Sequence, residues 1–224
     1  MKKSLLAFCS LALLSVVSCD KKNDPAPEPP VPGLFGDTLR GQIEDDIILK
    51  ENKVYYLDGP VFIKGNKTLT VQKGVIVKAI KTGKTQASQS HSFLVITRGS
   101  KIIAEGSADR PIVFTSAEPK GSRATGDWGG LMILGKAKVN TTYKGQPGRQ
   151  MEGFSDDNAA AYGDDIVGGG SDDNDNSGVL KYVRVEFAGI ALSNKSNSEL
   201  NSITFIGVGK NTVIDYVQSS FSGD

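Results

Sequence analysis

The chain has 224 residues, with 26 basic and 25 acidic side chains and a formal net charge of +1. This balance excludes the strongly basic surface of nucleic-acid-binding proteins. The sequence also has no polybasic segment that would bind an anionic membrane. Two cysteines, Cys9 and Cys19, are too few for a disulfide framework or a cysteine-based metal site, and Cys9 lies in a segment predicted to be removed.

Residues 1–18 have the pattern of a secretory signal peptide. The chain opens Met-Lys-Lys and continues with an apolar run from Leu5 to Val17. That run is shorter than the about 20 residues that span a bilayer. Its end, Val-Val-Ser-Cys at 16–19, resembles a bacterial lipobox, which predicts cleavage before Cys19 and lipidation of its thiol. The alternative is an ordinary signal peptide that leaves Cys19 as a free thiol.

Residues 19–33 are predicted to be an extended linker. Prolines at positions 25, 27, 29, 30 and 32 favour polyproline II, which rises about 3.1 Å per residue. The linker would therefore hold the folded part about 40 Å from a lipid on Cys19. The membrane, reached through this lipid, is the first predicted partner. We expect an exported outer-membrane lipoprotein that faces either the periplasm or the outside.

Residues 34–224 are predicted to form one all-β domain. Short runs rich in β-branched and aromatic residues are bounded by Gly, Asn or Asp, as strands with tight corners are. The main runs are 54–57, 61–63, 69–71, 75–77, 94–97, 101–104, 112–116 and 131–134. No helical segment lies between them, which leaves a sandwich, a barrel or a β-solenoid.

Internal repeats favour the solenoid. Residues 69–74 align with 94–99 at an offset of 25, and residues 180–189 align with 214–223 at an offset of 34. Such offsets suit coils of a parallel β-helix, in which neighbouring strands pair at about 4.8 Å and inward side chains stack in columns. A sandwich would show two-residue Asn-Gly hairpin turns, and the sequence has none.

Four segments carry a resemblance to a known family. They are 96–116, 126–135 (Gly-Asp-Trp-Gly-Gly-Leu-Met-Ile-Leu-Gly), 175–189 and 214–224. They resemble a family of exported lipoproteins of Bacteroidota-type bacteria, mostly of unknown function. The resemblance implies a right-handed parallel β-helix of the pectate-lyase-like fold. Family members continue beyond the Ser-Gly-Asp at 222–224, so it also implies that this domain is incomplete at its C-terminal end.

A long acidic loop, rich in Gly and Asn, is predicted at 140–178. Within it, Asp173, Asp175 and Ser177 alternate before Gly178, like the first half of a calcium loop. Oxygen ligands at this spacing can converge on Ca²⁺, the one cofactor that the sequence suggests. Arg184 stands where the closing Glu would fall. The alternative is a solvated acidic loop that keeps the protein soluble.

Further candidate ligand-binding residues are Trp128 and the acidic pairs Asp156, Asp157, Asp164 and Asp165. The Trp128 ring can stack on a sugar, or it can pack over a coil corner.

The sequence assigns no catalytic residue. We predict a non-enzymatic solenoid that binds a glycan or a surface protein, or has a structural role. The alternative is a polysaccharide lyase or glycoside hydrolase that uses the acidic loop. An enzyme of that kind would gather carboxylates within about 5–10 Å.

Overall fold

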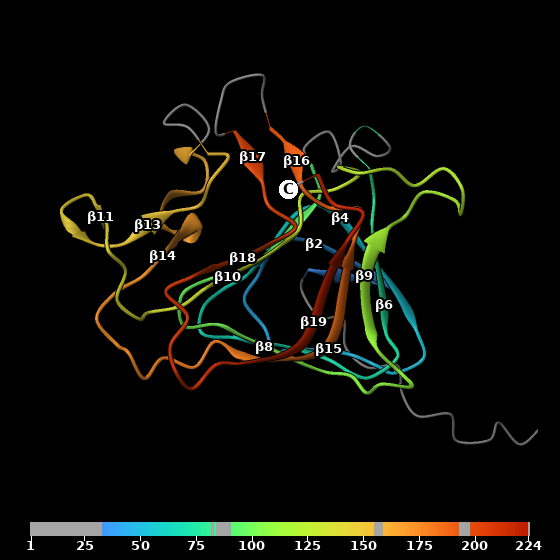
Figure 1. Cartoon of the computed structure of the whole chain (residues 1–224), viewed down its shortest axis with the longest axis horizontal. Helices are drawn as coiled ribbons and strands as arrows, with labels where there is room; N and C mark the ends of the chain where they lie inside the picture. Colours follow the sequence, from blue (N-terminus) through green and yellow to red (C-terminus); the bar gives the residue numbers. More distant parts are fainter. Residues whose placement is uncertain (1–32, 82, 84–90, 155–158, 193–197, 224) are drawn as a thin grey trace, which may run out of the picture.

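The computed structural model describes residues 33–81, 83, 91–154, 159–192 and 198–223. The predicted signal peptide, Cys19 and almost all of the linker lie outside these residues. The described strands wind into a parallel β-helix (Figure 1). Its main sheet has 13 strands within the described residues, which confirms the predicted fold class.

The strands form three ladders, named here faces A, B and C. Face A joins β2 (Thr38–Ile43), β4 (Val54–Ile63), β7 (Phe93–Ile96), β10 (Leu131–Leu134) and β18 (Ile203–Ile206). Face B joins β3 (Ile47–Leu49), β5 (Thr68–Val71), β8 (Lys101–Glu105), β15 (Gly178–Glu186) and β19 (Val213–Ser220). Face C joins the first halves of β2 and β4 to β6 (Ile76–Ala79), β9 (Ile112–Ser116) and the second halves of β15 and β19.

The pairing confirms one predicted repeat and shows that the other is wrong. Leu180 pairs with Ile214, as the offset of 34 requires. Leu69, however, pairs with Ile102 on face B, and Leu94 pairs with Val61 on face A. Residues 69–74 and 94–99 therefore lie on different faces. They look alike because each is a short buried strand that runs into a glycine corner, and not because one stacks on the other.

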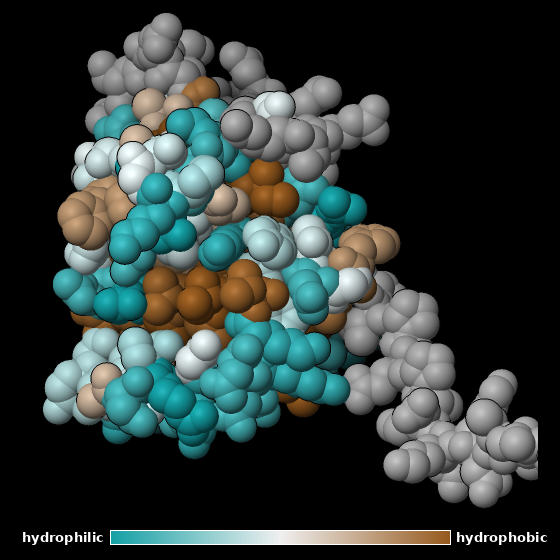
Figure 2. Space-filling view, turned by 90° about the vertical axis from the view of Figure 1, so that its right-hand side faces the viewer, coloured by the Kyte–Doolittle hydropathy of each residue, from teal (hydrophilic) through white to brown (hydrophobic). Residues whose placement is uncertain are grey.

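The outside of face C carries a short apolar column. Val54 pairs with Ile76, which pairs with Val113. Figure 2 turns this side toward the viewer and shows a brown apolar band across a largely polar surface. In the later coils the column continues with Arg184 and then Gln218, so the band ends in polar side chains.

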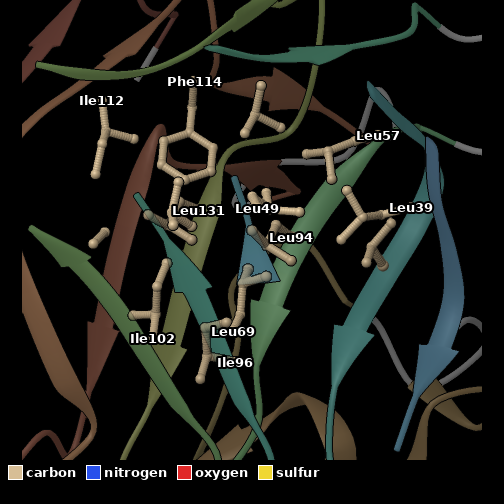
Figure 3. Packing of buried hydrophobic residues seen from close by; sticks show 14 of the residues in the cluster. Leu39, Leu49, Leu57, Leu69, Leu94, Ile96, Ile102, Ile112, Phe114 and Leu131 are labelled. Atoms are coloured by element: carbon tan, nitrogen blue, oxygen red, sulfur yellow. The ribbon is translucent and has the colours of Figure 1, made fainter. Parts of the chain in front are cut away.

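The inner core lies between the three faces. Strands such as β5 and β6 alternate partly exposed and buried residues, because successive side chains of a strand point to opposite sides. Inward leucines and isoleucines of different strands meet inside the coil (Figure 3). In one inward column of face B, Val71, Ala104 and Leu180 pair in turn and are at most 1% exposed. Ile214, which pairs with Leu180 on the last strand, is 42% exposed.

Residues 135–177, named here the insertion, leave the coil between β10 and β15. The predicted loop at 140–178 falls in this segment, but its described part has structure of its own. The short elements of the insertion are β11 (Thr142–Tyr143), β12 (Gln146–Pro147), β13 (Arg149–Gln150), η2 (Gly163–Ile166) and β14 (Val167–Gly168). Outside it, the short strands are β1 (Leu34–Phe35), β16 (Ile190–Ala191) and β17 (Glu199–Leu200).

The insertion packs on the outside of face A and forms a second, outer core. Every residue of β7 and β10 is buried, which is expected of strands covered on both sides. From face A the outer core takes Phe62, Phe93, Val95, Met132, Leu134 and Ile206, from the insertion Met151, Phe154, Ala159, Ile166 and Val167, and from β17 Leu200. Two polar contacts add to the docking. Lys64 Nζ lies 2.7 Å from Asp165 Oδ2, and Arg98 donates to the Gly169 carbonyl oxygen at 3.3 Å.

Candidate functional site

A polar groove lies where the insertion meets the last strand of face A, and it encloses about 410 Å³. Its polar side chains belong to Lys138, Asn140, Arg149, Glu152, Asn201 and Thr204. Two stretches far apart in the sequence thus meet here, the insertion on one side and the approach to β18 on the other.

The register of face A explains why the groove opens at β18. Phe62, Val95, Met132 and Thr204 pair successively across the face and form one outward column. The first three are buried beneath the insertion, whereas Thr204 is partly exposed. The column therefore changes from apolar to polar where the groove begins.

Glycine holds the wall of the insertion close to the strand. A Cβ at Gly168 would lie 2.6 Å from Ile206 Cβ, closer than real Cβ atoms approach. Only glycine therefore lets β14 lie directly against β18. Because β13 pairs antiparallel with β14, with Arg149 opposite Gly168, this contact also fixes the backbone of Arg149 beside the groove.

Some polar side chains of the groove have a hydrogen-bond or ion-pair partner among the described residues, and others do not. Arg149 and Asn140 are exposed, and their side chains make no hydrogen bond or ion pair within the part of the chain that the structure describes. Asn201 Nδ2 donates to Glu152 Oε2 at 3.2 Å. Lys138 Nζ lies 3.2 Å from Asp173 Oδ2, with both side chains more than half exposed. An ion pair so open to water contributes little stability.

The predicted calcium ligands do not all turn toward one point. Asp173 accepts a hydrogen bond from the Lys138 backbone N–H at 3.2 Å. This bond, with that from the Lys138 side chain, lowers the pKa of the Asp173 carboxyl below its usual value. Asp175 is only 6% exposed, and its Oδ2 accepts from Ser177 Oγ at 2.7 Å. Among the described residues there is no group of three or more His, Cys, Asp or Glu that could hold a metal ion.

Of the other predicted acidic residues, the structure describes Asp164 and Asp165. Asp165 docks the insertion on Lys64, and Asp164 lies 3.7 Å from the exposed Lys144 ammonium. Asp156 and Asp157 lie outside the described residues. Of the two described residues, Asp165 makes the more buried contact, since its side chain is 24% exposed and that of Asp164 is 67% exposed.

Trp128 is buried at the corner that leads into β10. Its side chain has 0% exposure, and its Nε1 donates to the Glu186 carbonyl oxygen at 2.8 Å. This placement fits the alternative of a corner residue and leaves the ring no exposed face for a sugar.

Asp127, beside Trp128, holds a buried polar cluster that the sequence analysis missed. Its carboxylate accepts from Lys81 Nζ at 2.8 Å, Ser116 Oγ at 2.7 Å and the Ala124 backbone N–H at 3.0 Å. Burial raises the pKa of Asp127, but the bonds from Lys81, Ala124 and Ser116 outweigh burial and leave the pKa below its ordinary value. The cluster ties the loop before Trp128 to face C.

The sequence analysis also missed the groove residues. Lys138, Asn140 and Arg149 lie in or beside the predicted acidic loop, but they are not acidic, and Asn201 and Thr204 are about 50 residues away. The change from the apolar runs Phe-Leu-Val-Ile and Leu-Met-Ile-Leu to Ile-Thr-Phe-Ile at 203–206 is the one available signal. It marks the strand whose outward column turns polar.

Comparison with known proteins agrees with the fold. Residues 41–224 match the family model described as a pectate-lyase-like β-helix domain. No curated protein and no solved structure shows a significant match to the chain. In the described residues, no helix has the length and apolar character that crossing a membrane would require.

Proposed function

Because the chain belongs to the pectate-lyase-like β-helix domain family, a fold that by itself assigns no reaction, we propose its function from the groove. The protein is an exported, lipid-anchored β-helix that binds a glycan between the insertion and β18. The observation that carries this proposal is the gathering of hydrogen-bonding side chains in one groove, with Arg149 and Asn140 unpartnered within the described residues. Sugars are recognised by such polar groups, which bond their hydroxyls and substituents.

The groove favours binding over hydrolysis. Glycoside hydrolases of the usual kind use two carboxyl groups about 5–9.5 Å apart. Among the described residues that line the groove, Glu152 is the only carboxylate, and it already accepts a hydrogen bond from Asn201. The groove therefore offers a binding surface without the paired acids of that mechanism.

The N-terminal sequence supports the anchoring part of the proposal. The signal-peptide pattern, the lipobox-like end at Cys19 and the proline-rich linker together describe a tethered, exported domain. Two or more acyl chains bind a membrane far more firmly than one. A lipid on Cys19 would therefore keep the groove close to the membrane surface, where it can encounter glycans.

Two experiments test the proposal. A glycan array probed with the full chain should give a defined set of binders, and Asn140→Ala with Thr204→Ala should weaken them. An array without any binder refutes glycan recognition. If a protein bound through the same groove, protein binding would take the place of glycan binding as the function of the groove. For the anchor, palmitate labelling in the native host should mark the wild type and be lost in Cys19→Ser. An unlabelled wild type contradicts the lipid anchor.

A further inference from the structure

The groove carries more donors than acceptors, and its strongest donor has no partner among the described residues. We propose that the groove selects glycans that bear a carboxylate or a sulfate, and that Arg149 binds this oxyanion. The inference rests on the proposed function and adds the class of ligand to it.

Arg149 is placed for this role by the backbone around it. Its strand β13 is held antiparallel to β14, and the residue opposite it is Gly168, which has no side chain to cover the guanidinium. The guanidinium is planar and always charged, and its fork of donors matches the two oxygens of a carboxylate or sulfate. The strand thus fixes the base of the side chain and leaves its tip to a ligand.

The neighbouring cations show that Arg149 differs from those that hold the fold together. Lys64 binds Asp165, and Arg98 donates to the Gly169 carbonyl oxygen, so both dock the insertion. Arg149 has no such partner within the described residues. A cation without a hydrogen bond or ion pair among the described residues, at the edge of a groove, is available to bind an external anion.

The rest of the groove fits a sugar that carries the anion. Lys138 is a second cation, and its exposed pair with Asp173 is easily exchanged for a ligand oxygen. Because Asn201 donates through Nδ2 to Glu152, its carbonyl oxygen remains to accept a bond from a sugar hydroxyl. Glu152 thereby acts as a positioning residue, and Asn201, Asn140 and Thr204 supply neutral contacts.

The test is direct binding of the full chain to one polysaccharide in three matched forms. These are chondroitin sulfate, its desulfated form, and the desulfated form with its carboxyl groups reduced. A glycan array sorted into neutral, carboxylated and sulfated sugars is measured in parallel. We expect the binders to be anionic, and the three forms separate sulfate from carboxylate recognition. Arg149→Ala should weaken binding about 10- to 100-fold, since a hydrogen bond to a charged group contributes about 1.5–3 kcal/mol.

Two variants complete the test. Arg149→Lys should retain the charge and part of the affinity, and Lys120→Ala, which removes an exposed cation far from the groove in the sequence, should change nothing. Unchanged melting temperatures for all three variants would show that folding is intact. Neutral binders that do not respond to Arg149→Ala would overturn the anion selectivity and leave glycan binding standing. The absence of any glycan binder would overturn both.

Discussion

The buried carboxylate of Asp127 gives the sharpest test of how the corner before β10 is held. Its side chain is fully buried and accepts three hydrogen bonds, from Lys81, Ser116 and the Ala124 backbone N–H. In Asp127→Asn, one carboxylate oxygen becomes an NH₂ group. At least one of these donors then faces another donor, and Lys81 loses its counter-charge.

The expected loss of stability follows from these contacts. Removing one partner of a buried ion pair costs about 3–5 kcal/mol, and a hydrogen bond to a charged group contributes about 1.5–3 kcal/mol. The side chain of Lys81 is 46% exposed, so water replaces part of what it loses. We therefore expect a decrease of about 2–4 kcal/mol in the free energy of unfolding. For a domain of this size, that lowers Tm by about 5–15 °C.

Denaturant unfolding at neutral pH, followed by circular dichroism, measures this loss. Asp164→Asn is the matched control, because Asp164 and its partner Lys144 are 67% and 69% exposed and their pair should contribute less than about 0.5 kcal/mol. If Asp127→Asn falls within about 0.5 kcal/mol of the wild type, the cluster does not hold the corner and the reasoning fails.

The pH dependence provides a second measurement on the same carboxylate. The pKa of Asp127 in the folded chain is lowered, so its contribution is fully present above the unfolded pKa of about 3.9. It is lost as pH falls through the lower, folded pKa. The stability difference between wild type and Asp127→Asn should therefore shrink below about pH 4. A difference that grows in acid would contradict the sign of this argument.

Three further measurements test the packing, and a fourth tests the predicted calcium site. Gly178→Ala should cost at least about 2 kcal/mol of unfolding free energy, because φ is +113° and an added Cβ would overlap the Ile102 carbonyl oxygen; an unchanged Tm would contradict this. Phe154→Ala should cost about 3 kcal/mol, with faster hydrogen exchange in the insertion while β5 stays protected. Tyr216→Ala should cost about 0.5–1.5 kcal/mol, since its ring stacks on Tyr182 at 4.5 Å; no loss in a urea titration would exclude the stack as a contributor. Calcium should leave Tm unchanged, because Asp173 and Asp175 turn to different partners, whereas a saturable rise would restore the calcium site.

The strands could be predicted from the sequence because their runs are short, β-branched and closed by corners. The runs at 112–116 and 131–134 coincide with β9 and β10. The coil register was harder to predict. The offset of 34 is correct because the aligned segments, β15 and β19, each cross the same corner, at Tyr182 and Tyr216, with φ of 50° and 52°. The offset of 25 relied on a short strand that ends near a glycine, a pattern that both face A and face B repeat.

Two strand sequences already indicated the outer core, although the repeat pattern alone did not show it. Phe-Leu-Val-Ile at 93–96 and Leu-Met-Ile-Leu at 131–134 contain no polar residue, which indicates strands buried on both sides. What covers them could not be predicted, since Met151, Phe154 and Ile166 are spread through a segment rich in Gly and Asp. For the same reason the groove stayed hidden, because its residues meet only after the insertion has docked.

Under the proposed function, the insertion determines where on face A a ligand can bind. Without it, Phe62, Val95 and Met132 would form an exposed apolar column along face A, the kind of surface that soluble proteins avoid. With it, that column is sealed and closed to any ligand. Thr204 continues the column beyond the seal, and there the edge of the insertion supplies Arg149 and Asn140. The proposed glycan site therefore lies at this edge, where the solenoid's own strand and the insertion each contribute one wall.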